Sequence, residues 1–198
     1  MKRTMTDRVD KFIEIAMTEC RMVFDNQKLL DWLGDNGYFT APASSKYHGA
    51  YPGGLYDHSE AVYNRLAELT SKLGLQWERP ESPFIVGFFH DLCKCDQYIE
   101  QKGIVLLDES DIGVKHYGEG IASYEHNDKL LLKGHGDKSV MLLSQFMSLT
   151  EEEMLCIRYH MGAYEKDDWD GLDLAIRKYP TVWYAHTADM LASKADNI

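Results

Sequence analysis

Histidine and aspartate recur at or near expected helices along this chain, and they are its residues best suited to chemistry. The set comprises His58, His90, Asp91, His135, His160, His186 and Asp189. Imidazole nitrogens and carboxylate oxygens form a ligand set that suits Mn, Fe, Co, Ni, Zn or Mg better than a metal that prefers thiolates. Because His90 and Asp91 are adjacent, a complete site needs further ligands from other helices. A metal centre here has to be assembled from across the fold.

Among the basic residues near the candidate ligands in the sequence, we single out Lys94, Lys138 and Arg158. Each is a candidate for binding a phosphate group. Lys94 follows Asp91 by three positions, so the two side chains can share a helix face or its end, and Lys138 stands in the same relation to His135. Lys138 and Arg158 can also be read as ordinary charges on a helix surface.

These histidines and aspartates lie in several short motifs that follow one another along the chain. GGLYDHS spans 53–59, HDLCK spans 90–94 and HTAD spans 186–189. GHGDKS at 134–139 and IRYHMG at 157–162 add two histidine motifs, and YHGA at 47–50 precedes the first motif. In this order the sequence resembles the HD superfamily of metal-dependent phosphohydrolases, in its binuclear form with extra histidines. The YHGA segment is similar to the entry of the HD domain in some bacterial 3'-5' exoribonucleases.

The resemblance implies a role for each ligand. A first ion would be held by His58, His90, Asp91 and Asp189. Asp91 would bridge to a second ion held by His135 and His160. The implied cofactor is a divalent metal, two ions drawn from Fe, Mn, Ni, Co, Zn or Mg, and such a pair activates a water and holds phosphoryl oxygens during in-line attack. We therefore expect an enzyme, a phosphohydrolase or phosphodiesterase acting on a nucleotide or short oligonucleotide.

Other roles are assigned less directly. Asp91 and Lys94 are the expected catalytic residues, and substrate contacts are expected from His48, Lys94, Lys138 and Arg158. His48 can equally be a solvated loop residue. We expect a supporting or packing role for His186, surface positions for His116 and His126, and packing roles for Cys93 and Cys95, whose Cys-x-Cys spacing without partners is weak evidence of a metal site.

Two other functions remain open. Mixed-valent di-iron oxygenases related to inositol oxygenase use the same order of six ligands in an HD-type fold, so ligand identity does not separate them from hydrolases. A nucleotide-binding sensor that kept its ligands and lost turnover is a non-enzymatic alternative. Oxygen-dependent turnover would indicate the first, and binding without hydrolysis the second.

The sequence predicts a mainly α fold, a single HD-domain helical bundle with a small β-hairpin insert. We expect one domain over 1–198, with an HD core at about 40–195 and an N-terminal helical segment at 7–33. Helices are expected at 55–73, 84–93, 138–149 and about 182–194, and another begins at the capping box Thr150–Glu153. Short apolar runs between 97 and 128, such as Ile104–Leu107, favour the hairpin. Residues 96–127 match nothing in the resemblance.

Composition limits the expected partners. The formal net charge is −11, with Lys and Arg dispersed along the chain, which argues against binding long nucleic acid. A small phosphorylated substrate remains compatible with an acidic protein if a metal and local basic residues supply positive charge. The sequence contains no membrane-spanning apolar run, no signal-peptide pattern and no disulfide-like cysteine spacing, so we expect a cytoplasmic protein without membrane contact. The oligomeric state, the substrate and the identity of the metal stay open.

Overall fold

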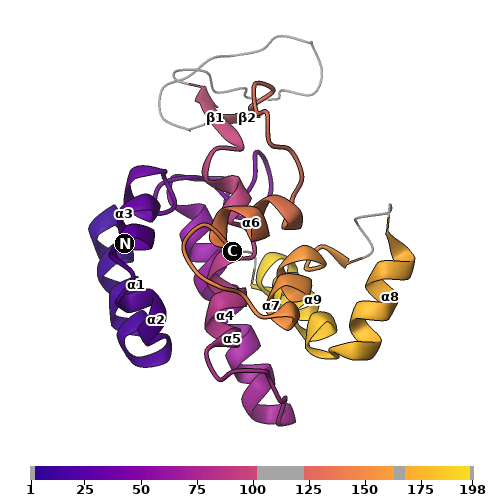
Figure 1. Cartoon of the computed structure of the whole chain (residues 1–198). Coiled ribbons are helices and arrows are strands. Elements are labelled where there is room, and N and C mark those ends of the chain that lie inside the picture. Colours follow the sequence, from indigo (N-terminus) through magenta and orange to yellow (C-terminus); the bar gives the residue numbers. More distant parts are fainter. Residues whose placement is uncertain (1–2, 102–122, 163–167, 197–198) are drawn as a thin grey trace.

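The computed structural model describes residues 3–101, 123–162 and 168–196. Over these residues the fold is mainly helical with a small β-hairpin, as the sequence predicts (Figure 1). The helices are α1 (Met5–Glu19), α2 (Arg21–Phe24), α3 (Gln27–Asp35), α4 (Gly54–Leu73), α5 (Ser82–Phe89), α6 (Gly136–Leu143), α7 (Glu151–Arg158), α8 (Trp169–Lys178) and α9 (Thr181–Met190). A 3-10 helix, η1 (Leu92–Cys95), follows α5, and one turn of π-helix, η3 (Leu191–Ala195), extends α9.

Helices α4 and α5 form the centre of the molecule. Every residue of α5 is buried, and α4 packs against both α5 and α9. A Cβ at Gly87 would lie only 2.5 Å from the Tyr63 Cα, so the close contact between α4 and α5 requires glycine at this position. This contact brings the α4 residue His58 beside His90 at the end of α5, with ring centroids 5.3 Å apart.

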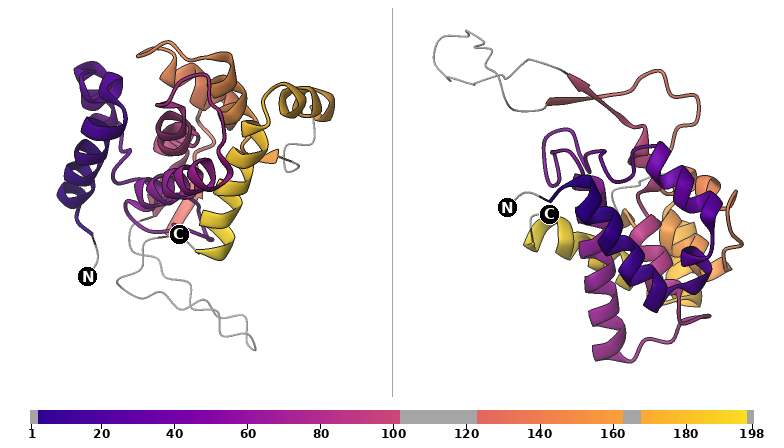
Figure 2. Two further views of the ribbon diagram at one scale, coloured as in Figure 1. Left: turned by 90° about the horizontal axis from the view of Figure 1, so that it is seen from below. Right: turned by 90° about the vertical axis from the view of Figure 1, so that its left-hand side faces the viewer.

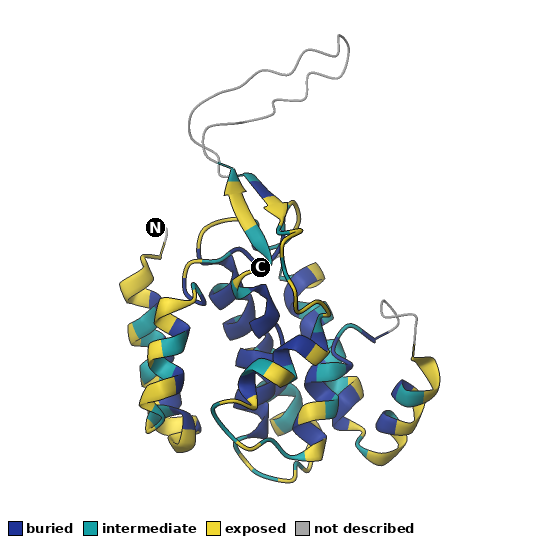
Figure 3. Ribbon diagram, turned by 45° about the horizontal axis from the view of Figure 1, so that its top comes forward, coloured by how far each residue is buried: buried dark blue, intermediate teal, exposed yellow. Residues whose placement is uncertain are grey.

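The N-terminal helices α1–α3 lie against one side of these central helices (Figure 2). Phe12 of α1 anchors them, because its ring makes edge-to-face contacts with Phe88 of α5 at 5.3 Å and with Phe39 of the following loop at 5.7 Å. Figure 3 shows buried residues concentrated in the central helices, whereas the outer face of the N-terminal helices is exposed. The predicted helical segment at 7–33 is confirmed.

The β-hairpin stands away from the helical body (Figures 1 and 2). Strands β1 (Tyr98–Gln101) and β2 (Ser123–His126) pair antiparallel, with Tyr98 opposite His126. The predicted apolar run Ile104–Leu107 and His116 lie outside the described residues. His126 is exposed at the end of β2, as expected for a surface histidine.

Several boundaries differ from the predicted ones. The helix expected at 84–93 ends at Phe89 and continues, after a turn at His90 and Asp91, as η1. The helix expected at 138–149 ends at Leu143. Helix α8 was not predicted, although Asp168 caps it through the Gly171 amide. Apolar side chains continue past these ends, because Leu92 and Cys93 are buried in η1, and Phe146 and Met147 pack partly buried against the core after α6.

The capping box at Thr150 is confirmed: its hydroxyl accepts from the Glu153 amide, and the Glu153 carboxylate accepts from the Thr150 amide. Gly74 ends α4 with a φ of +64°, the left-handed conformation expected at a helix C-terminus. No helix in the described part of the chain is both long enough and apolar enough to cross a lipid bilayer.

Candidate metal centre

Six predicted ligands come together around one carboxylate, that of Asp91. They arrive from five parts of the fold: α4, the turn after α5, the start of α6, the turn after α7, and α9. They are His58, His90, Asp91, His135, His160 and Asp189. Packing of α4 against α5 and α9, and of α7 against α6 and α9, positions these segments relative to one another.

We call His58, His90 and Asp189 the first half of this cluster. One oxygen of Asp91 faces His58 and His90. The Asp91 Oδ2 atom lies 3.4 Å from the His90 Nε2 and 3.6 Å from the His58 Nε2. The His58 Nε2 is also 3.1 Å from the Asp189 Oδ1. Ring nitrogens and carboxylate oxygens therefore converge on one small volume, as ligands of a shared ion do.

We call His135 and His160 the second half of the cluster. The other oxygen of Asp91 faces these two histidines. The Asp91 Oδ1 atom lies 2.8 Å from the His135 Nε2 and 3.4 Å from the His160 Nε2. All three atoms are buried without a hydrogen-bond partner among the described residues, so the 2.8 Å approach is short but not aligned as a hydrogen bond. Buried polar atoms without partners are costly, and a bound cation would satisfy all three at once.

Two histidines are fixed in the tautomer that a metal requires. The His90 Nδ1 lies 2.9 Å from the carbonyl oxygen of Gly87, and the His160 Nδ1 lies 2.7 Å from that of Ile157. A carbonyl oxygen only accepts, so each Nδ1 carries the proton and each Nε2 offers its lone pair to the cluster. Both carbonyls belong to the last turn of a helix, where backbone oxygens lack helical partners.

Burial and charge keep the carboxylates ionised. Burial alone would raise the pKa of Asp91, but Lys94, with its Nζ 2.6 Å from the Asp91 Oδ2, and His90 hold that pKa well below its usual value. Burial would likewise raise the pKa of Asp189, but the hydrogen bond with His58 lowers it. Burial lowers the pKa of His135, which favours its neutral, metal-binding form.

Two groups of side chains at this centre have the geometry to hold a metal ion. His58, His90 and Asp91 form one, and Asp91, Cys93 and His135 form the other; within each group the ligand atoms all lie within 4.8 Å of one another. With the unpartnered nitrogens and oxygen described above, the residues present fit a divalent cation. Asp91 belongs to both groups.

Glycines with positive φ lie beside both histidines of the second half. Gly134 has a φ of +113° and Gly162 a φ of +55°, both in the region that favours glycine. These conformations turn the backbone next to His135 and His160 and let both side chains leave a helix end. His186 supports this half from α9, since its Nδ1 lies 2.7 Å from the carbonyl oxygen of His160.

The predicted substrate-binding residues divide into two pairs. Lys94 is buried at the cluster, and the His48 ring lies 4.9 Å from that of His58. Lys138 is buried but forms an ion pair with Asp96, and the half-exposed Arg158 pairs with acidic side chains of Asp137 and Asp168. Lys138 and Arg158 are therefore paired with acidic residues outside the six candidate ligands.

One supporting residue was missed by sequence reasoning. The Ser139 Oγ accepts a hydrogen bond from the Cys93 amide at 3.0 Å and donates to the His135 carbonyl oxygen at 3.3 Å. These two hydrogen bonds of Ser139 link η1 to the start of α6. Its place in the GHGDKS motif, four residues after a ligand histidine, was the available signal, because four residues make about one helical turn.

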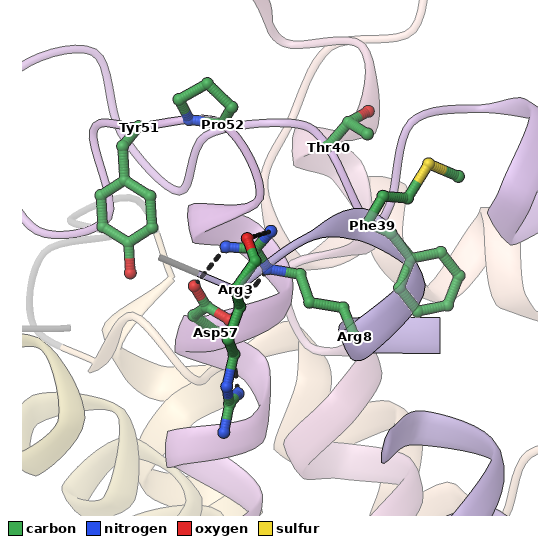
Figure 4. Close-up of a pocket in the computed structure, with 8 residues that line it drawn as sticks. Arg3, Arg8, Phe39, Thr40, Tyr51, Pro52 and Asp57 are labelled. Carbon is green, nitrogen blue, oxygen red and sulfur yellow. Dashed lines mark hydrogen bonds and ion pairs between the residues drawn. The ribbon is translucent and has the colours of Figure 1, made fainter. Parts of the chain in front are cut away.

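A separate pocket of about 600 Å³ lies between α1 and the start of α4 (Figure 4). Arg8 donates to both oxygens of Asp57 at 3.0 and 2.7 Å, and Arg3 pairs with Asp57 and Glu60. The residues that line it are Arg3, Met5, Arg8, Phe39, Thr40, Tyr51, Pro52 and Asp57. They include none of the six ligands, and the pocket's charges are paired with each other, so the chemistry is expected at the smaller polar cluster.

Comparison with known proteins yields no match: no family model, no curated protein and no solved structure is similar to this chain.

Proposed function

We propose that this protein is an HD-type metal-dependent phosphohydrolase that cleaves a phosphate ester of a nucleotide or short oligonucleotide at the Asp91 centre. The observation that carries the proposal is the position of Asp91. One of its oxygens faces His58 and His90 and the other faces His135 and His160. A single carboxylate between two sets of imidazoles is the arrangement that a bridging ligand of two cations needs.

The order of the ligands supports the same proposal. His58, the His90–Asp91 pair and Asp189 follow the HD signature, and all of them lie in the cluster. In this proposal they hold the first cation, while His135 and His160 hold the second together with Asp91. When bound, such a pair of cations supplies a water of lowered pKa and neutralises charge on the phosphoryl oxygens.

Lys94 favours a phosphorylated substrate. Its ammonium is almost fully buried, with Nζ 2.6 Å from the Asp91 Oδ2. Asp91 raises the pKa of Lys94 against the opposing effect of burial, so the charge is retained. We infer that Lys94 binds a phosphoryl oxygen of the substrate while it remains beside Asp91, and that it stabilises the negative charge that develops there.

His48 is proposed to contact the substrate from the loop that precedes α4. Burial, then the neighbouring His58, lowers its pKa to about 4, so the imidazole stays neutral near pH 7. Its Nδ1 is buried without a hydrogen-bond partner in the described part of the chain. A neutral imidazole can donate to or accept from a substrate oxygen or base without adding charge.

The test combines metal content with hydrolysis. Protein stripped with a chelator and reloaded with Mn²⁺, Co²⁺, Zn²⁺ or Fe²⁺ is assayed against bis(p-nitrophenyl) phosphate, nucleoside monophosphates and dinucleotides. We expect metal-dependent hydrolysis, about two ions per chain in the wild type, and a fall towards one ion in His135→Ala and His160→Ala. A fully loaded, folded protein that hydrolyses none of these substrates would refute the proposal.

The same assay separates the alternatives. Hydrolysis that proceeds equally under argon and under air excludes an oxygenase role for that reaction. Consumption of oxygen by the iron-loaded protein without release of phosphate would instead favour the di-iron oxygenase. Saturable nucleotide binding without turnover would favour the sensor.

A further inference from the structure

Cys93 lies at the second half of the Asp91 centre and has no part in the proposed ligand set. Its Sγ lies within 4.8 Å of a ligand atom of Asp91 and of one of His135. The side chain is almost fully buried, and its thiol makes a weak contact, 3.8 Å, with the Gln97 Oε1. A thiol this close to two candidate metal ligands can bind the same ion once it is deprotonated.

Two further observations point to a cation at this position. The Asp91 Oδ1 and the His135 Nε2 are both buried and lack hydrogen-bond partners among the described residues, and Asp91 is only 1% exposed. The Ser139 hydroxyl also bonds both to the Cys93 amide and to the His135 carbonyl oxygen. One hydroxyl therefore fixes the backbone of Cys93 relative to that of His135, as a ligand pair requires.

We propose that Cys93 is a thiolate ligand of the second cation, and that it makes this half of the centre selective for a thiophilic ion such as Zn²⁺ or Co²⁺. This inference rests on the proposed function, because it adds a ligand to the same centre. On binding, the metal–sulfur bond replaces the S–H bond, and the proton leaves to solvent.

The two halves of the centre then differ in chemistry. The first half offers only nitrogen and oxygen ligands from His58, His90, Asp91 and Asp189, which Mn²⁺ or Fe²⁺ can accept. The second half offers oxygen, nitrogen and sulfur from Asp91, His135, His160 and Cys93. Zn²⁺ and Co²⁺ bind such mixed sets, whereas Mg²⁺ prefers oxygen ligands. We expect a mixed-metal state when both kinds of ion are supplied.

The experiment is a Co²⁺ titration of the chelator-stripped full chain, followed by absorption spectroscopy and elemental analysis. Thiolate bound to Co²⁺ gives an intense near-ultraviolet charge-transfer band that nitrogen and oxygen ligands do not give. We expect this band in the wild type and in the matched control Cys95→Ser, which alters the other cysteine of η1. We expect its loss in Cys93→Ser, with at least about tenfold weaker Zn²⁺ binding at the second site.

The outcomes are separable. Two bound Co²⁺ ions without the charge-transfer band in the wild type, or a band that persists in Cys93→Ser, would overturn the thiolate ligand and leave the proposed function standing. Failure of the wild type to bind Co²⁺ at all would overturn both. If Cys93→Ser does not fold, X-ray absorption of the Zn²⁺-loaded wild type decides, since a sulfur neighbour at about 2.3 Å is expected and its absence refutes the proposal.

Discussion

Lys94 and Asp91 form a buried ion pair at the centre of the cluster, with the Lys94 Nζ 2.6 Å from the Asp91 Oδ2. Both side chains are less than a tenth exposed. A buried pair of this kind contributes little net stability by itself, but removing one partner leaves an uncompensated charge in a poorly solvated place. If the proposed function holds, metal binding, substrate binding and folding are coupled at these two residues.

Lys94→Met is expected to reduce catalysis while the metal stays bound. Loss of one charge-assisted hydrogen bond to the substrate costs about 2 kcal/mol, a factor of about 30 in kcat/KM. Steady-state kinetics on the best phosphate ester, with elemental analysis of the same sample, check this. The control is Lys72→Met, because Lys72 is exposed on α4 and pairs with Glu68. Unchanged kcat/KM in Lys94→Met would remove Lys94 from the reaction.

Asp91→Asn is expected to destabilise the metal-free fold because it leaves the Lys94 ammonium buried without its counter-charge. The expected loss is about 3 kcal/mol in the free energy of unfolding. The double variant Asp91→Asn with Lys94→Met should recover part of this loss, although both variants should lose metal. Urea denaturation in the presence of chelator measures the free energy of unfolding of each variant. Equal stability of the single and double variants would show that the pair is not coupled.

Glu153→Gln tests the buried polar contacts that hold α7, the helix that precedes His160. The Glu153 side chain is fully buried and accepts from the Arg79 Nε at 2.7 Å and from the Ser82 Oγ at 2.8 Å. Neutralising it is expected to lower the free energy of unfolding by about 3 kcal/mol. Glu151→Gln, at an exposed position of the same helix, should have little effect. Similar urea midpoints for both variants would contradict the prediction.

His48 is expected to make stability depend on pH between about 4 and 6.5. Its pKa is lowered to about 4 in the folded protein, mainly by burial, whereas an unfolded histidine titrates near 6.5. The unfolded state therefore binds more protons in this range, so the contribution of His48 weakens the fold as the pH falls from 6.5 towards 4. The contribution is constant above that window.

Urea midpoints at pH 7 and pH 5, measured with chelator, test this dependence. The difference between the two midpoints should shrink in His48→Gln, because the titrating group is gone. His126→Gln should leave it unchanged, since His126 is exposed on β2. An identical pH dependence in wild type and His48→Gln would show that His48 titrates normally.

Local chemistry in the sequence predicted the helix ends that side chains define. Thr150 and Glu153 mark the start of α7, because the side chain of each accepts a hydrogen bond from the backbone amide of the other. The break after Phe89 was missed. It leaves the C-terminal end of α5 free for the His90 ring to bind the Gly87 carbonyl, an interaction that hydrophobic periodicity does not register.

The order of the motifs predicted which histidines and aspartates lie together, but it did not predict the surroundings of each basic residue. Lys94 lies three residues from Asp91, and the turn of η1 brings the two side chains together. Arg158 lies two residues from His160, yet it pairs with Asp168, beyond the turn that follows α7. Which acidic residue a lysine or arginine meets depends on how distant segments pack, and a single sequence does not contain that information.

The distribution of the ligands from α4 to α9 also has a consequence for the order of folding. The cluster is complete only when the segment carrying Asp189 has docked, because that residue supplies the carboxylate beside His58. Contacts between residues so far apart in the chain form late, since closing long loops costs entropy. A cation bound at the proposed centre would tie five segments together and would have to dissociate before the helices could separate, so its residence time would set the protein's lifetime under proteolytic attack.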